Sequence, residues 1–240
     1  MILSALPPHI PNEVYLDFLG RTVQIRWDYH ATLMFIIWFV LVPLSVISIR
    51  YCKPKPTPYG IRKKIKVTNI EWWWFHVHKY GLYFAILLSI VGVAVAMTVS
   101  RGFSGSVHAW FGITAVGLGV LQVISSWFRG THGGRYYDKA DPDDPSTWHG
   151  DHFDMTPRRR LFEAFHKNVG YFAGMFAVGA VASGLAQYPM PLLTVVALAT
   201  VFAIIVLCVV LEHKGRRYDT YRAVFGTNPE HPFNKARKDL

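Results

Sequence analysis

Four histidines near the ends of four apolar stretches are the residues of this chain best suited to chemistry: His30, His78, His108 and His166. An ionisable side chain in a membrane segment is costly, so such residues usually mark a function. Successive membrane helices run in opposite directions, which places His30 and His108 near one face of the bilayer and the other two near the opposite face. Two imidazoles that face each other at one depth can ligate a b-type haem axially. The pattern therefore predicts two bis-histidine haem b sites, one per leaflet, that form an electron path across the membrane.

The elements that must position these histidines are helices that cross a membrane. Hydrophobic residues make up 52% of the 240-residue chain and gather in five stretches, each with about the 20 residues needed to span the hydrocarbon core. We predict an all-α membrane protein with five transmembrane helices, in which a four-helix haem-binding core is joined by a fifth helix. The stretches are 29–51, 72–98, 103–128, 161–188 and 191–212.

The charges predict the orientation of these helices. The formal net charge is +10, and Lys and Arg gather after the first, third and fifth stretches, which five spans place on one side. The positive-inside rule makes that side cytoplasmic, so we expect the N-terminus outside and the C-terminus in the cytoplasm, as in a bacterial inner membrane. Because these cations flank apolar segments, they indicate contact with membrane lipid and no nucleic-acid partner.

Three regions follow from this reading: an outer segment 1–28, a transmembrane domain 29–213 and a cytoplasmic tail 214–240. The first 11 residues lack a basic n-region and an apolar h-region, so we expect no cleavable signal peptide. Apolar and polar residues mix over 12–25, where Asn12 is a candidate helix cap, so the segment fits an interfacial amphipathic helix. An ordered loop fits it equally well.

The segment 131–157 is rich in Gly, Pro and Asp and is expected to be a solvated cytoplasmic loop. Its His132, His149 and His152 lie near aspartates, but their spacing matches no strong zinc pattern. The two cysteines, Cys52 and Cys208, lie far apart and form no C-x-x-C, which argues against an iron–sulfur site and a disulfide framework. No C-x-x-C-H is present, so any haem is held without covalent attachment.

Two further features bear on the histidine pairs. Gly112 and Gly170 each follow a candidate ligand by four residues and so share its helix face, where a flat macrocycle needs close approach. Helix packing against small residues is the alternative explanation. His76 is the rival of His78, but it lies two residues away and hence on nearly the opposite face of its helix.

Charged and aromatic neighbours of the histidines are candidates for the ends of the electron path. Lys79 and Lys167 directly follow the two inner histidines, and Arg160 lies just before the fourth stretch, so all three could hold haem propionates or an anionic reductant. The topology signal alone would also explain them. Trp110, beside His108, is expected at the exit of the outer haem.

Several segments together resemble the eukaryotic-type cytochrome b561 family. The segment HATLM (30–34), with Trp38, Pro43, Arg50 and Tyr51 after it, resembles the family's first core helix, and WFHVH (74–78) resembles its W-F-x-x-H element. SVHAWFG (106–112) is similar to its S-L-H-S-W-x-G motif. Arg160, six residues before His166, with Gly170 beyond, resembles its fourth-helix element. The match covers roughly 27–187 in the right order.

The resemblance implies a four-helix core with two b haems and pairs the first ligand with the third and the second with the fourth. Family members move single electrons across membranes, often from cytoplasmic ascorbate to monodehydroascorbate or ferric iron. This chain departs from the family: Ala31 replaces a glycine, Phe162 and Glu163 replace Trp-Asn, and five spans stand for the usual six. We also expect no attached DOMON domain. These departures leave the ascorbate assignment open.

The expected function is one-electron transfer through the two haems, between a cytoplasmic or quinone-side donor and an outer-side redox protein or larger complex. A small reductant or a quinone would serve as the membrane-side partner, and a reductase activity toward ferric iron, monodehydroascorbate or quinone stays open. One alternative is a haem b anchor subunit that links the quinone pool to a partner dehydrogenase or cytochrome. An alternative of another class is a non-redox transporter with intramembrane histidines.

Overall fold

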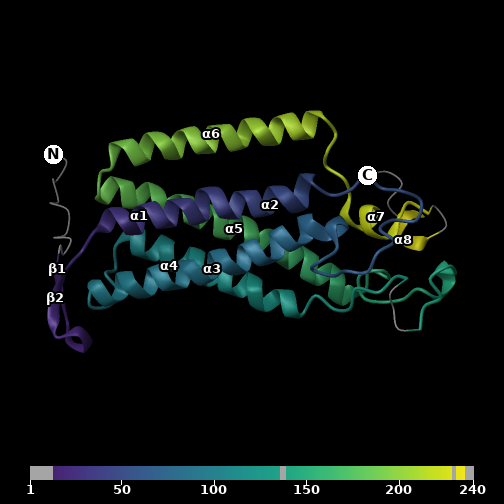
Figure 1. Ribbon diagram of the computed structural model, residues 1–240, viewed down its shortest axis with the longest axis horizontal. Helices are drawn as coiled ribbons and strands as arrows, with labels where there is room; N and C mark the ends of the chain where they lie inside the picture. Colours follow the sequence, from purple (N-terminus) through teal and green to yellow (C-terminus); the bar gives the residue numbers. More distant parts are fainter. Residues whose placement is uncertain (1–12, 136–138, 229–230, 236–240) are drawn as a thin grey trace.

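The computed structural model describes residues 13–135, 139–228 and 231–235, and it is dominated by long helices (Figure 1). Five helical segments are long and apolar enough to cross a membrane, which confirms the predicted number of spans. The first is continuous through three parts, α1 (Trp27–Phe35), η2 (Ile36–Leu41) and α2 (Val42–Tyr51). The others are η3 (Ile70–Trp72) with α3 (Trp73–Val99), α4 (Val107–Trp127), α5 (Pro157–Gln187) and α6 (Pro191–His213).

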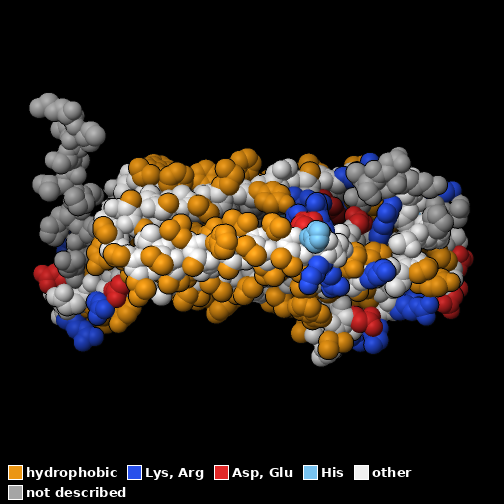
Figure 2. Space-filling model, turned by 90° about the horizontal axis from the view of Figure 1, so that it is seen from above, with side chains coloured by type: hydrophobic (Ala, Val, Ile, Leu, Met, Phe, Trp, Pro, Cys, Tyr) orange, Lys and Arg blue, Asp and Glu red, His pale blue; other side chains and the backbone are white. Residues whose placement is uncertain are grey.

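The long helices lie side by side in one elongated bundle, with α6 along its outside (Figure 1). The helix α6 packs against the first span through Ala197, which is buried against Phe35 and Phe39. In the space-filling view an apolar band covers the middle of the bundle, and charged side chains gather towards its two ends (Figure 2). We call these the hairpin end, near residues 13–24, and the basic end, near α7 and α8.

Local capping signals in the sequence set several helix boundaries. The Ser106 hydroxyl accepts a hydrogen bond from the Ala109 N–H at the start of α4, and Thr156 does the same for Arg159 at the start of α5. Proline occupies the first turn of α5 and of α6, where its missing N–H has no intrahelical partner to lose. The caps therefore fix where the histidines of α4 and α5 fall along the bundle.

A π-helical segment interrupts the first span. It covers Ile36–Leu41 and ends just before Pro43, the proline that lies deep in this span. Proline removes one helical hydrogen bond and crowds the preceding turn, and a local wide turn accommodates both effects. Because the wide turn changes the helix register, α1 and α2 can each serve a different histidine pair.

Residues 13–24 form a hairpin, and the expected interfacial helix is wrong. Strand β1 (Glu13–Leu16) pairs antiparallel with β2 (Arg21–Gln24) through the short turn η1 (Asp17–Leu19). Gly20 adopts a φ of 60°, which closes this turn without steric cost. Alternation of β-branched, aromatic and polar residues in both strands favours this pairing over a helix. Asn12, the candidate cap, lies outside the described residues.

At the basic end three segments fold together, so the expected solvated loop is also wrong. The segment 131–157, with η4 (Pro145–Thr147), packs against residues before α3 and against α7 (Thr220–Phe225) and α8 (Pro232–Lys235) of the tail. We call this unit the cap. Its buried core consists of Ile61, Trp72, Trp74, Trp148, Phe153, Met155, Tyr221, Val224 and Phe225.

Single hydrogen bonds tie the segments of the cap to one another. The Tyr221 hydroxyl donates to the Phe153 carbonyl over 2.8 Å, and the Lys53 ammonium donates to the Thr220 hydroxyl over 3.1 Å. Within the part of the chain that the structure describes, no three His, Cys, Asp or Glu side chains are grouped to hold a metal ion. Two histidines of segment 131–157, His132 and His152, pack against the Phe225 ring, whereas His149 is largely exposed beside Asp154.

Candidate functional site

At the hairpin end, His30 of α1 faces His108 of α4. Their ring centroids are 6.2 Å apart and the ring planes are nearly perpendicular, at 84°. The Nδ1 atom of His108 lies 2.8 Å from the Ala180 carbonyl oxygen of α5, to which it donates when the proton is on that nitrogen. His30 packs edge-on against Trp27 at 6.0 Å. The bond to Ala180 orients one ring so that its Nε2 is left to bind a ligand.

The same two histidines line a cavity of about 490 Å³. This volume lies within the range of about 300–1,000 Å³ that is typical of cofactor and small-molecule sites. The walls come from all the surrounding spans and are mostly apolar, whereas Ser104, Ser106, Gln187 and Tyr188 stand towards the hairpin end. The pair therefore belongs to a hollow that is large enough for a planar cofactor.

At the basic end, His78 of α3 faces His166 of α5. The ring centroids are 6.3 Å apart, with an angle of 75° between the planes. The Nδ1 atom of His78 lies 3.2 Å from the Ser45 carbonyl oxygen of α2, and His166 stacks on Phe162 at 5.1 Å. As at the hairpin end, a backbone carbonyl orients one ring of the pair through Nδ1.

Gly112 lines the cavity at the hairpin end, and Gly170 lies on an exposed part of α5 four residues after His166. A Cβ atom added at Gly112 or at Gly170 would meet no heavy atom within 4 Å, so both positions predicted from the spacing border open space. Gly184 differs, because a Cβ there would lie 2.8 Å from the His108 Nδ1 atom. Close packing of α4 on α5 at the hairpin end therefore requires glycine at position 184.

The rival histidine, His76, does not face His166. Its Nε2 lies 3.0 Å from the Lys66 carbonyl oxygen, and its ring stacks on Tyr80 at 5.8 Å. The side chain thus points to the segment before α3 instead of into the bundle. The structure places His78, not His76, in the basic-end pair.

The charged neighbours named from the sequence occupy several places. Lys79 lies over the rings of Tyr80 and Tyr83, at 4.9 and 5.9 Å. Arg160 donates from Nε to the Met155 carbonyl over 2.9 Å, which attaches α5 to the cap. Lys167 pairs with Glu163 over 3.1 Å. Their roles toward a propionate or a reductant stay predictions.

Trp110 lies outside the set of residues that line the cavity. Its side chain is 61% exposed and packs edge-on against Phe103, with ring centroids 4.8 Å apart. Trp110 therefore takes the position of an aromatic anchor at the membrane boundary. Its predicted part in binding the outer haem stays a prediction.

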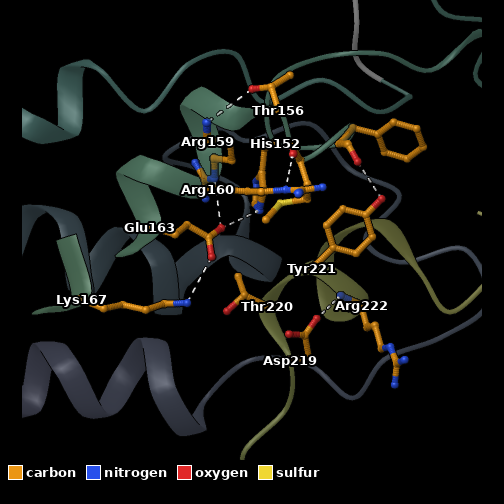
Figure 3. A network of polar contacts seen from close by, with 12 residues as sticks. His152, Thr156, Arg159, Arg160, Glu163, Lys167, Asp219, Thr220, Tyr221 and Arg222 are labelled. Carbon is orange, nitrogen blue, oxygen red and sulfur yellow. Dashed lines mark hydrogen bonds and ion pairs between the residues drawn. The ribbon is translucent and has the colours of Figure 1, made fainter. Parts of the chain in front are cut away.

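A polar network joins the cap to α5 close to His166 (Figure 3). Glu163, one turn before His166, bonds to Arg159 and to Lys167, each over 3.1 Å. The buried His152 of the cap places its Nε2 3.8 Å from the Glu163 carboxylate. Burial, reinforced by nearby Arg159, holds the pKa of His152 well below its usual range. The cap thus contacts α5, the helix that carries His166 of the basic-end pair.

Sequence reasoning missed the residues that orient the rings. Ser45 is 1% exposed. The single proton of the nearby Ser48 hydroxyl is shared between the Ser45 carbonyl at 2.8 Å and the Trp74 carbonyl at 2.9 Å, which attaches α2 to α3. Gly81 lets the Ser45 side chain approach α3. The two serines spaced by three in an apolar helix, with a glycine three residues after His78, are the signal that could have found this contact.

The ring spacings fit a metal ion between each pair. With about 2 Å from a metal to each imidazole nitrogen and about 1.2 Å from that nitrogen to its ring centroid, two axial imidazoles have centroids about 6.4 Å apart. The observed values are 6.2 and 6.3 Å. In each pair one imidazole, that of His108 or His78, is oriented through Nδ1. Two facing imidazoles, one of them held in this way, match the donor set of a bis-histidine haem.

Comparison with known proteins finds two plant relatives from Arabidopsis thaliana. A cytochrome b561, DM13 and DOMON domain-containing protein is 31% identical over 101 residues, which are 42% of this chain and 10% of the relative. A cytochrome b561 and DOMON domain-containing protein is 27% identical over 109 residues, 45% of this chain and 21% of the relative. The chain thus spans about a tenth and a fifth of the relatives it matches. No protein-family profile and no solved structure matches it.

Proposed function

We propose that this protein transfers single electrons across a membrane through two b haems, each held by one histidine pair. The observation that carries the proposal is the pair of matching ring spacings, 6.2 Å between His30 and His108 and 6.3 Å between His78 and His166. Similarity to two cytochrome b561 domain-containing proteins supports the same assignment. The chemistry that the haem supplies is reversible one-electron exchange at its iron.

The protein residues orient the ligands, exclude water and set the distance between the two sites. The Ser45 and Ala180 carbonyls hold the Nδ1 protons of His78 and His108 and so leave each Nε2 free to ligate. The apolar walls of the cavity exclude water from the hairpin-end site. His30 precedes Ser45 by 15 residues in the first span, which corresponds to roughly 20 Å along a helix and sets the separation of the two sites.

The charge distribution supports an orientation and a pair of partners. The cations gather at the basic end, which the positive-inside rule assigns to the cytoplasm. We propose that a quinone or a small reductant meets the basic-end haem there. The cavity mouth at the hairpin end would then face an outer-side redox protein, because the short hairpin and turns leave little room for a self-contained substrate site.

A visible spectrum of the purified protein, oxidised and then reduced with dithionite, tests the proposal. We expect a reduced α-band near the b-type position, roughly 560 nm, and about two haems per chain by pyridine haemochrome. His76→Gln is the matched control, because His76 lies in the first turn of α3 but belongs to neither histidine pair. This variant should keep the haem content of the wild-type protein. A protein that stays colourless when expressed with added haem would overturn the proposal and favour a transporter.

A further inference from the structure

The segment that leads into α3 carries four exposed cations within five residues: Arg62, Lys63, Lys64 and Lys66. It runs from the cap core at Ile61 to Trp73, the first residue of α3. We call residues 62–73 the basic shelf. Its place at the boundary of a membrane span puts these cations close to the level of the lipid headgroups.

Side chains from the start of α3 and from the preceding turn pin the backbone of the basic shelf. The Trp72 indole donates to the Lys63 carbonyl over 2.9 Å, and the Asn69 amide donates to the Lys64 carbonyl over 3.2 Å. His76 reaches the Lys66 carbonyl over 3.0 Å. Trp72 is itself 2% exposed and stacks on Trp74. The cations therefore project from a rigid support and not from a loose loop.

Exposed apolar side chains lie beside these cations. Val67 is 69% exposed, Ile70 79% and Trp73 46%. Trp73 lies where tryptophans concentrate in membrane proteins, at the boundary between headgroups and hydrocarbon. Exposed apolar residues that alternate with lysines are typical of a segment that lies in the membrane interface.

The charge of the shelf is only partly balanced. Lys63 lies 3.4 Å from Glu71, and Arg62 stacks on the Tyr59 ring at 5.0 Å. Across residues 13–135, 139–228 and 231–235, no carboxylate lies within ion-pair distance of Lys64 or Lys66. These two lysines are therefore available to an anion outside the protein.

We propose that the basic shelf binds the phosphate headgroups of anionic lipids, with Lys64 and Lys66 as the principal contacts and Val67, Ile70 and Trp73 seated in the interface. The apolar residues favour lipid over an acidic protein, because they lie at the membrane boundary beside the start of α3. The pinned backbone lowers the entropy lost when a headgroup is bound. His76 acquires a role here as the positioning residue for Lys66.

Spin-labelled lipids offer a direct test. The full chain is reconstituted in phosphatidylcholine, and the fraction of motionally restricted lipid is measured with spin-labelled phosphatidylglycerol and with spin-labelled phosphatidylcholine. We expect the wild-type protein to prefer phosphatidylglycerol. One lysine near an anionic surface contributes up to about fivefold, so Lys64→Gln with Lys66→Gln should lower the preference by roughly threefold to tenfold.

A second pair of exposed cations at the basic end is the matched control. Lys214→Gln with Arg216→Gln removes the same charge at the end of α6, outside the basic shelf, and should lower the preference by a smaller factor than the substitutions at Lys64 and Lys66. His76→Ala should weaken the preference without changing charge, and His76→Gln, whose amide can still donate, should restore it. Equal losses in both double variants, or no loss at Lys64 and Lys66, would overturn the proposal. So would an acidic protein that co-purifies through these lysines while the lipid preference stays.

Discussion

The two histidine pairs share a ring spacing of 6.2–6.3 Å and differ in what surrounds them. The hairpin-end pair lines a cavity of about 490 Å³ whose walls are mostly apolar and whose polar residues stand towards the end of the bundle. The basic-end pair lies beneath the cap, and ionic side chains of α5 link it to the buried His152. The same donor geometry is thus built into an open site and into a capped site. In the proposed function, ligation and access are therefore controlled by separate parts of the chain.

The largest expected effect separates the two sites by ligand loss. His108→Leu should remove the hairpin-end haem and His166→Leu the basic-end haem, because leucine has no nitrogen to ligate iron. Each purified variant should hold about one haem per chain instead of two by pyridine haemochrome. Loss of both haems in either variant would show that the sites are not independent, and retention of both would exclude these residues as ligands.

The second prediction concerns the orientation of the His108 ring at the hairpin end. A Cβ at position 184 would lie 2.8 Å from the His108 Nδ1 atom, so Gly184→Ala should displace the ring and break its bond to Ala180. Loss of such an orienting contact typically lowers metal affinity by about 10–100-fold, and overpacking costs about 1–3 kcal/mol. Haem titration of the apoprotein should show this for one site only.

Gly117→Ala is the control for that experiment. A Cβ at Gly117 would meet no heavy atom within 4 Å, so this substitution removes the same glycine flexibility without touching a ligand. It should leave both haem sites at wild-type affinity. If Gly184→Ala also binds two haems normally, the close packing of α4 on α5 is not what holds His108 in place.

The third prediction concerns how the stability of the cap depends on pH. Among the residues that the structure describes, the hairpin end has no such cap. Burial lowers the pKa of His132 to about 4, and that of His152 is lowered in the same direction. The unfolded histidines titrate near 6.5, so below that pH the unfolded state binds more protons than the folded state. The cap should therefore lose stability as the pH falls from about 6.5 to about 4, by roughly 2 kcal/mol for His132 after allowance for its partial exposure.

Limited proteolysis across that pH range measures the opening of the cap. Cleavage within segment 131–157 should accelerate as the pH falls, whereas cleavage near the hairpin should not. His132→Gln, which cannot take up a proton, should reduce the pH dependence without abolishing it, since His152 still titrates. An unchanged pH profile in this variant would mean that the pKa of His132 is the same in the folded cap as in the unfolded chain.

The difference between the two regions also explains which features the sequence predicts. The spans, the alternation of His30, His78, His108 and His166, and the open space at Gly112 follow from hydropathy and helix periodicity, which are local properties. The cap does not, because Ile61, Trp148 and Tyr221 come from three segments that are each too polar on average to predict packing. Their apolar side chains form a core only when the three segments meet.

The orienting contacts were hidden for a related reason. Ser45 and Ala180 act through backbone carbonyls, which every residue has, so residue type gives no signal. What selects these positions is the pairing of α2 with α3 and of α4 with α5, set by small residues such as Gly81 and Gly184. The hairpin was missed because a mixture of polar and apolar residues over 13–24 fits a strand pair as well as a helix.

The smallest predicted effect tests whether the cap influences the electron path as well as covering it. Glu163 lies one turn before His166 and balances Arg159 and Lys167. Glu163→Gln removes a negative charge and leaves both cations, which disfavours the more positive ferric state, so the potential of the basic-end haem should rise by roughly 20–60 mV. The hairpin-end haem in the same molecule is the internal control and should not shift. A redox titration that resolves the two haems measures both at once. Equal shifts would mean that Glu163 acts through the fold of the whole bundle, and no shift would mean that the network serves only to attach the cap to α5.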